Sequence, residues 1–214
     1  MKRELRWLAI ALSMLALGVL CARPYARLAS PFYALAARMI AHGRPWTISS
    51  VEVARGNSSP GAILRMSGTV SERKNDAVPG ARLVSKLQVA AAIEAPVIFW
   101  TLLVAWPAAS VRRLALIGIA VPIFVGLEVA TTVCQLIGPF AYASAVLAGD
   151  ADPVTWWERW SRFLEAGGRV GLAFVAALAT IGIAQWISRL RAHQVAALTA
   201  RSRLPRATSP REFS

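Results

Sequence analysis

Four long apolar runs place the strongest constraint on what this chain can fold into. They extend from about Leu5 to Cys21, from Leu87 to Ala108, from Leu114 towards Asp150, and from Val170 to Ser188. A bilayer hydrocarbon core of about 30 Å takes roughly 20 helical residues to cross. The chain is therefore predicted to be a membrane protein, mainly α, with four transmembrane helices.

The third run is longer than one span requires. It carries no charged residue except Glu128 until Asp150 is reached. A proline inside a helix removes a backbone hydrogen bond. Gly138-Pro139 is therefore predicted to end the third helix and to leave Phe140–Ala148 as an interfacial or re-entrant segment.

The composition agrees with a membrane protein. Of the 214 residues, 56% are hydrophobic and 16% are charged, and the mean hydropathy is +0.50, which is too apolar for a soluble fold. The chain has 24 Lys and Arg against 11 Asp and Glu, a net charge of +13. Beside long apolar runs, such an excess indicates membrane topology and not nucleic-acid binding. Two cysteines and two histidines are too few for a disulfide scaffold or a histidine-rich metal site, so no metal or cofactor is expected.

The positions of Lys and Arg predict the orientation. Basic residues precede the first span, fill the turn at 112–113 and dominate the tail at 189–214, whereas the connector from Asp150 to Arg169 is acidic on balance. The positive-inside rule then places both termini in the cytoplasm. The tail is expected to bind anionic lipid and to be disordered past about Leu204. A cleaved signal peptide in place of the first span remains an alternative, because a basic start before an apolar stretch has that form.

A short amphipathic helix is predicted directly after the first span. Ser30 would supply the N-cap and Pro31 the first helical residue. The helix would lie in the outer headgroup layer, or alternatively pack on a small domain of its own. Its apolar side chains recur at three- and four-residue spacing: Leu28, Phe32, Leu35, Ala36, Met39 and Ile40. Of these, Phe32, Leu35 and Met39 are the predicted interfacial anchors.

The residues that follow change to the alternation typical of strands. Three strands are predicted, at Trp46–Arg55, Ala62–Ser71 and Ala81–Leu87, with turn residues between them. Together with the preceding helix they would form an extracytoplasmic α+β module over 23–87. So small a sheet cannot fold unaided, so the module is expected to rest on the membrane, the helix or a partner. Its exposed edges could add a strand from another chain.

The connector at 139–168 is predicted to carry a second interfacial helix. Asp152 would cap this helix and Pro153 would begin it. Trp156, Trp157 and Trp160 then fall at helical spacing and would anchor the connector at the membrane surface. A ligand platform is the alternative for these rings.

Two glutamates lie inside the apolar runs, where an ionisable side chain is costly and marks a candidate functional site. Both fall in the outer half of the bilayer, and a cation at the outer start of the fourth span is placed to meet them. We predict one intramembrane polar cluster of Glu94, Glu128, Thr131, Thr132, Gln135 and Arg169. The cluster could accept protons, hold a polar headgroup or peptide, dock a charged residue of a partner, or only pack the helices together.

No catalytic motif accompanies this cluster. The sequence contains no Gly-x-Ser-x-Gly, no His-Glu-x-x-His and no phosphate-binding glycine loop. Cys21 and Cys134 both fall near the outer ends of their spans, where they could form a disulfide or serve as small apolar fillers. Neither histidine is placed to activate Cys134 as a nucleophile. We therefore expect that the protein is not an enzyme.

The order of these parts resembles that of a known family. Gln88 to Glu94-Ala95-Pro96 leads into the second span, Arg112-Arg113-Leu114 opens the third, and Glu165-Ala166-Gly167-Gly168-Arg169-Val170-Gly171 leads into a span that ends at Trp186. With the outer helix, the strand module and the tryptophan-bearing connector, this layout resembles the exosortase H-associated membrane proteins, small bacterial partners of a membrane-embedded sorting transpeptidase. The resemblance implies an accessory subunit in the inner membrane, with the catalytic cysteine supplied by the partner.

The sequence thus predicts an anchor at 1–22, the outer module at 23–87, a three-helix membrane region at 88–188 and a basic cytoplasmic tail at 189–214. The predicted function is that of a non-catalytic accessory or scaffold protein of a bacterial envelope process. The alternative is a small proton-linked transporter, or a membrane protein that binds a polar ligand, in which the two buried glutamates act. The absence of an internal repeat argues against a transporter.

Overall fold

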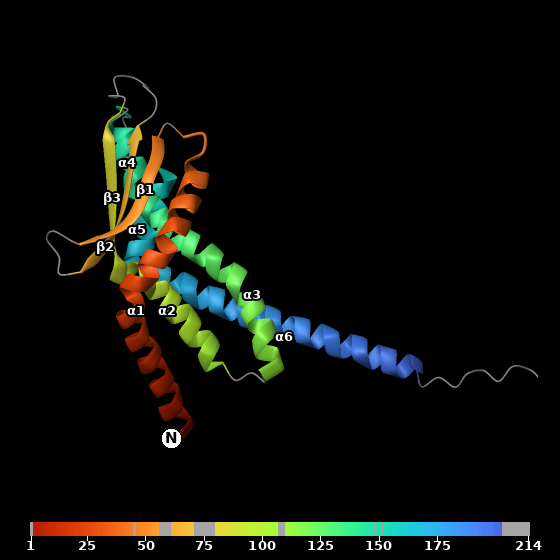
Figure 1. Ribbon diagram of the computed structural model, residues 1–214. Coiled ribbons are helices and arrows are strands. Elements are labelled where there is room, and N and C mark those ends of the chain that lie inside the picture. The colour runs from red at the N-terminus through yellow and green to blue at the C-terminus, as the bar shows by residue number, and fades with distance from the viewer. Residues whose placement is uncertain are drawn as a thin grey trace, which may run out of the picture.

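The computed structural model describes residues 2–44, 46–55, 61–70, 80–106, 110–147, 149–150 and 152–202. The fold is mainly helical with one small sheet (Figure 1). In chain order the elements are α1 (Lys2–Ala41), β1 (Trp46–Arg55), β2 (Ala62–Val70), β3 (Arg82–Gln88), α2 (Val89–Ala105), α3 (Ser110–Glu128), the π-helix η1 (Val129–Val133), α4 (Cys134–Leu147), α5 (Trp156–Phe163), the π-helix η2 (Leu164–Gly168) and α6 (Arg169–Ser202). Most predicted turn residues between the strands, and the tail from Arg203, lie outside the described residues.

The three strands form an antiparallel meander in the order β1-β2-β3, as their alternation predicts. On β2 the inward side chains include Leu64 and Met66, neither of which is exposed. The register between β1 and β2 shifts by one residue between Ile48 and Ser50, which marks a β-bulge at Ser49. The guanidinium of Arg38 on α1 donates to the carbonyl oxygens of Ile48 at 3.3 Å and Ser49 at 2.7 Å. One helical arginine thereby ties α1 to the bulge.

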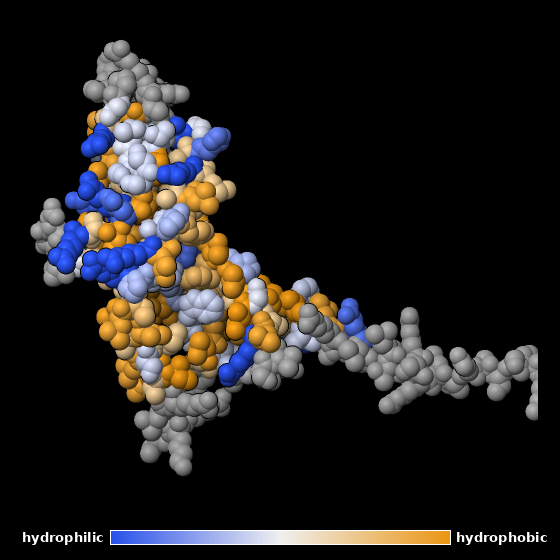
Figure 2. Space-filling model, viewed as in Figure 1, coloured by the Kyte–Doolittle hydropathy of each residue, from blue (hydrophilic) through white to orange (hydrophobic). Residues whose placement is uncertain are grey.

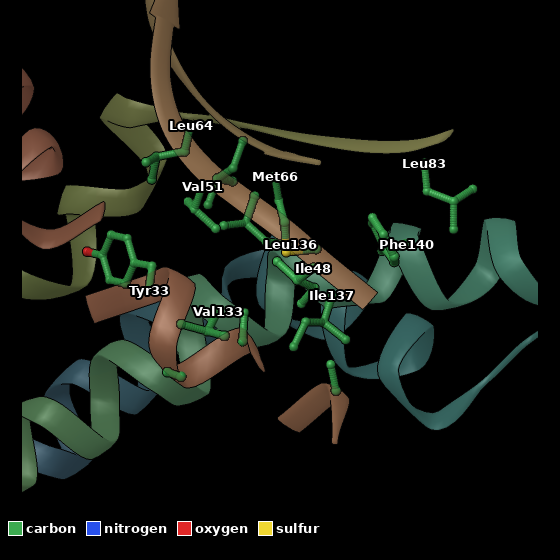
Figure 3. Packing of buried hydrophobic residues seen from close by; sticks show 14 of the residues in the cluster. Tyr33, Ile48, Val51, Leu64, Met66, Leu83, Val133, Leu136, Ile137 and Phe140 are labelled. Atoms are coloured by element: carbon green, nitrogen blue, oxygen red, sulfur yellow. The ribbon is translucent and has the colours of Figure 1, made fainter. Parts of the chain in front are cut away.

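One face of the sheet packs on the chain's own helices. Figure 3 shows Met66 of β2 beside Leu136 and Ile137 of α4, and Leu64 belongs to the same core cluster. The C-terminal half of α1 packs beside β1 and adds its buried residues to the same core. The sheet therefore rests on α1, which includes the residues of the predicted outer helix, and on α4, which was not among the expected supports.

The first helix is continuous, so the prediction of a separate helix that starts at Ser30 is wrong. A single helix of 40 residues runs through Pro24 and Pro31. Pro31 has no N–H for the Arg27 carbonyl, but the hydroxyl of Ser30 donates to that carbonyl at 2.9 Å. The Ser-Pro pair therefore continues the helix with a side-chain substitute for the lost backbone bond.

The packed face of α1 also differs from the predicted apolar stripe. The buried residues in the C-terminal half of α1 are mostly alanines, and Tyr33 is the one large side chain among those described. By contrast, Leu28, Leu35 and Met39 are 82%, 59% and 72% exposed. Small residues let a helix lie close to its neighbours. The long apolar side chains therefore face outward, and Phe32 is only partly buried against the core.

The predicted break at Gly138-Pro139 is also wrong. Helix α4 runs to Leu147 through Pro139, and it follows α3 and η1 without interruption. Pro139 has no N–H to donate to the Gln135 carbonyl one turn earlier. That carbonyl instead accepts a hydrogen bond from the Ser161 hydroxyl of α5 at 3.5 Å. Phe140 is 1% exposed and packs edge-on against Trp46 with ring centroids 5.3 Å apart. Phe140 is therefore a core residue and not part of an interfacial segment.

A second core joins α2, α3 and α6. It contains Ala95, Phe99, Ala120, Ala173 and Ala177, all at most 1% exposed. Helix α6 continues to Ser202, beyond the predicted end at about Ser188, so the first part of the basic tail is helical. In Figure 1, α6 extends away from the other helices towards the C-terminal end of the described chain.

Three helices in the described ranges are long and apolar enough to cross a membrane: Leu8–Ala41, Arg113–Leu147 and Trp156–Leu190. The third contains a kink at Gly167, whose φ of 103° is in the region that favours glycine. Helix α2, at the second predicted span, is apolar but has only 17 residues. These helices indicate a membrane-embedded protein.

Candidate functional site

A buried carboxyl group lies where the sheet-bearing part of the chain meets the apolar helices. Glu128 ends α3 and is 2% exposed. The Tyr33 hydroxyl of α1 donates to Glu128 Oε2 at 2.5 Å, and the Thr132 hydroxyl donates to the same oxygen at 3.5 Å. The phenol of Tyr25 contacts both Tyr33 and Glu128. We call these four residues the Glu128 cluster.

The two tyrosines of this cluster were not among the predicted site residues. Tyr33 lies between Ala26 and Ala37 on the packed face of α1, and all three are 1% exposed. A tyrosine among alanines at helical spacing could have indicated a buried polar site, because a buried Tyr hydroxyl needs a hydrogen-bond partner. That signal does not identify the partner, which is 95 residues further along the chain.

A π-helical turn follows Glu128 directly. In η1 the Ala130 carbonyl accepts from the indole N–H of Trp160 at 2.8 Å. Thr131 donates to the Leu127 carbonyl of its own helix at 2.8 Å. π-Helical turns alter the backbone ladder locally and free carbonyl groups for other donors. Trp160 is therefore a structural link between α5 and η1 as well as a partly buried ring.

Gln135 is buried beside the contact between α4 and α5. It is 4% exposed, and its Oε1 has no hydrogen-bond partner among the described residues. Helices α4 and α5 approach so closely here that a Cβ on Gly138 would lie 2.5 Å from Ser161 Cβ. Gln135 therefore lies at a tight helix crossing, and within the described residues no hydrogen bond joins it to Glu128.

Arg169 and Glu94 form a separate pair. Arg169 begins α6, and its guanidinium donates to the Ala91 carbonyl at 2.6 Å and lies 4.0 Å from Glu94 Oε2. The Arg169 side chain is 11% exposed, whereas that of Glu94 is 45% exposed. Within the described parts of the chain, no hydrogen bond or ion pair joins this pair to Glu128. The predicted single cluster is thus resolved into two groups with different exposure.

The aromatic helix α5 is capped by Thr155, not by Asp152. The Thr155 hydroxyl accepts from the Glu158 N–H at 3.3 Å, as in a capping box. Asp152 instead accepts from the Val154 N–H at 3.3 Å. Thr155 was missed because Asp152-Pro153 has the more familiar cap-and-proline pattern.

The aromatic rings of α5 differ in what they contact. Trp156 is 62% exposed and stacks on Trp160 with centroids 5.6 Å apart. Trp157 is partly buried against the core that contains the sheet. Only Trp156 of the three therefore presents most of its surface outward.

Neither cysteine forms a disulfide. Cys21 is exposed and Cys134 is buried, and both are free. The disulfide alternative is therefore wrong.

Within the described residues, no three His, Cys, Asp or Glu side chains gather closely enough to hold a metal ion.

No protein-family model, curated protein or solved structure matches this chain. The class that the fold defines is that of a mainly helical, membrane-embedded protein with a small antiparallel sheet.

Proposed function

We propose that the protein is a non-catalytic accessory or scaffold protein of a bacterial envelope process, embedded in the inner membrane. It assists a membrane partner such as a sorting transpeptidase, in line with the family that its layout resembles. The observation that carries this proposal is the Glu128 cluster. Glu128, the most deeply buried carboxyl group among the described residues, accepts a hydrogen bond from Tyr33 and so joins α1 to the end of α3. This bond holds the helix beside the sheet against the apolar helices.

The proposed topology has four spans with both termini in the cytoplasm. Helix α2 supplies the span beyond the three long helices. Its 17 residues have a length of about 25 Å at 1.5 Å per residue, close to a bilayer core. Basic residues beside the ends of the spans support the orientation.

Glu94 is the proposed contact for the partner. Its neighbours on α2, Ile93 and Ala95, are buried, but its own side chain is 45% exposed on an apolar helix. An exposed carboxylate at membrane depth is costly unless it meets a cation or a polar group. Arg169 lies 4.0 Å away but already donates to the Ala91 carbonyl. A basic side chain of a partner span would complete the pairing of Glu94.

Crosslinking and affinity purification from native membranes in mild detergent test this proposal. The wild-type protein should retain a stoichiometric membrane protein, and Glu94→Gln should lose it. Glu52→Gln is the matched control, because Glu52 is exposed on β1 and outside the membrane helices. Recovery of the wild-type protein alone and monodisperse would refute the scaffold proposal.

The alternative is transport in which Glu94 and Glu128 act. One observation favours it, since Glu128 Oε1 is buried without a hydrogen-bond partner among the described residues. The bond from Tyr33 to the other oxygen favours the structural role. Reconstitution of the wild type and of Glu128→Gln in proteoliposomes separates transport from scaffolding. If the protein is a transporter, the wild type should show pH-driven flux and the folded Glu128→Gln variant should lose it. If the protein is a scaffold, even the wild type should show no flux.

A further inference from the structure

An open cavity lies where α1 passes the end of the sheet. It has a volume of about 900 Å³ and is bounded by the middle of α1, by the adjoining ends of β1 and β2, and by the β3–α2 junction. This size is in the range of sites for small organic ligands. The residues that decide its chemistry are Leu20, Arg23, Arg55, Ile63, Gln88 and Val89.

The cavity has an uncompensated positive charge. Arg23 and Arg55 both line it, and no carboxylate does among the described residues. Neither guanidinium has a hydrogen bond or an ion pair within the described ranges of the chain. Two guanidinium groups that have no partner among the described residues favour an anion at this cavity, and a phosphate group suits their planar donors best.

The apolar part of the cavity continues into the membrane-facing surface of α1. Val19 and Leu20 line the cavity and are 67% and 78% exposed. They end the charge-free run Trp7–Ala22, and Arg23 is the first charged residue after it. Arg23 therefore lies at the level where hydrocarbon gives way to headgroups. Figure 2 shows hydrophilic surface gathered where the sheet meets the apolar helices, directly beside hydrophobic surface.

We propose that this cavity binds one anionic phospholipid. Arg23 and Arg55 contact the lipid phosphate, and the Gln88 amide contacts the polar headgroup. The first carbons of the acyl chains lie against Leu20, Ile63 and Val89 and continue along the outside of α1. The site is distinct from the basic tail and does not depend on the accessory role. It would hold a lipid between α1 and the sheet end.

Native mass spectrometry of the detergent-purified protein tests the site with phosphatidylglycerol and phosphatidylcholine as probes. The wild type should retain one phosphatidylglycerol in preference to phosphatidylcholine. The double variant Arg23→Gln with Arg55→Gln should lose at least about tenfold in affinity for phosphatidylglycerol, because it removes two charge-assisted donors. Equal retention of both lipids by the wild type would overturn the proposal.

The matched control is Arg44→Gln with Arg82→Gln. Both are exposed arginines outside the cavity, near the opposite end of the sheet from Arg55. This control changes the net charge by the same amount and should keep the lipid preference. The same loss in both double variants would assign the effect to overall charge and overturn the site.

A second variant tests the cavity itself. Ala90→Trp keeps both arginines but fills space, because Ala90 is exposed and lines the cavity. It should weaken phosphatidylglycerol binding while the protein remains folded by circular dichroism. Unchanged binding would contradict a cavity site. Competition by inorganic phosphate as strong as that by the lipid would assign the arginines to a free anion and also overturn the proposal.

Discussion

The hydrogen bond between Tyr33 and Glu128 should make a large and measurable contribution to folding stability. The two residues are 1% and 2% exposed, and their oxygens lie 2.5 Å apart, which is the length of a charge-assisted bond. Removing the hydroxyl by Tyr33→Phe takes away the short bond to Glu128 Oε2 and leaves the long 3.5 Å contact from Thr132 and the neighbouring phenol of Tyr25. A buried acceptor that loses its donor costs about 1–3 kcal/mol.

A double-mutant cycle isolates this interaction. The variants are Tyr33→Phe, Glu128→Met and the double variant, and Met keeps a similar length without a polar group. Hydrogen bonds to charged groups contribute about 1.5–3 kcal/mol, whereas cycles in one membrane protein average about 0.6 kcal/mol. Because both groups are buried and the bond is short, we expect a coupling energy of about 1.5–3 kcal/mol. The double variant should therefore be more stable than the sum of the single losses predicts.

The assay is unfolding by sodium dodecyl sulfate from dodecyl maltoside micelles, followed by circular dichroism. Tyr142→Phe is the control, since Tyr142 is 37% exposed and outside the cluster. It should change the free energy of unfolding by less than about 0.5 kcal/mol. A coupling energy below about 0.5 kcal/mol would refute the idea that this bond holds α1 against the end of α3.

Three further predictions address packing and reactivity. Gly138→Ala should destabilise the protein by about 1–3 kcal/mol in the same assay, because the added Cβ would lie 2.5 Å from Ser161 Cβ of α5. The control Gly118→Ala should be neutral or stabilising, since nothing lies within 4 Å of the added Cβ there. Trp160→Phe should lower the free energy of unfolding by about 0.5–1.5 kcal/mol, because it removes the indole N–H that donates to the Ala130 carbonyl of η1. An unchanged free energy of unfolding would contradict a stabilising role for this hydrogen bond. An apolar maleimide should label Cys21 but not Cys134 in the folded protein, and mass spectrometry that finds both labelled would show that α4 is not packed as described.

Local pattern predicted the sheet almost completely. Alternation along Ala62–Val70 predicts the buried face of β2, because successive side chains of a strand point to opposite faces. The antiparallel meander follows from short connections between neighbouring strands. The bulge at Ser49 was not predictable, since the Arg38 contact that accompanies it comes from another element.

The prolines show where local rules fail. Pro31 and Pro139 both look like helix boundaries, and both lie inside helices. The lost backbone bonds are replaced by side-chain donors, Ser30 in one case and Ser161 in the other. Ser30 is adjacent in sequence and could have been recognised, but Ser161 is brought to Gln135 only by the packing of α5 on α4.

The sequence alone determined that the chain is membrane-embedded, where its apolar helices lie approximately, and that Glu94, Glu128 and Arg169 are exceptional residues. These properties depend on hydrophobicity and on periods of two or three to four residues, which are local quantities. Only the tertiary structure decided the partners: Tyr33 for Glu128, and Ala91 together with Glu94 for Arg169. A buried polar group must be satisfied, but which distant group satisfies it depends on how the helices cross, and that is a property of the whole fold.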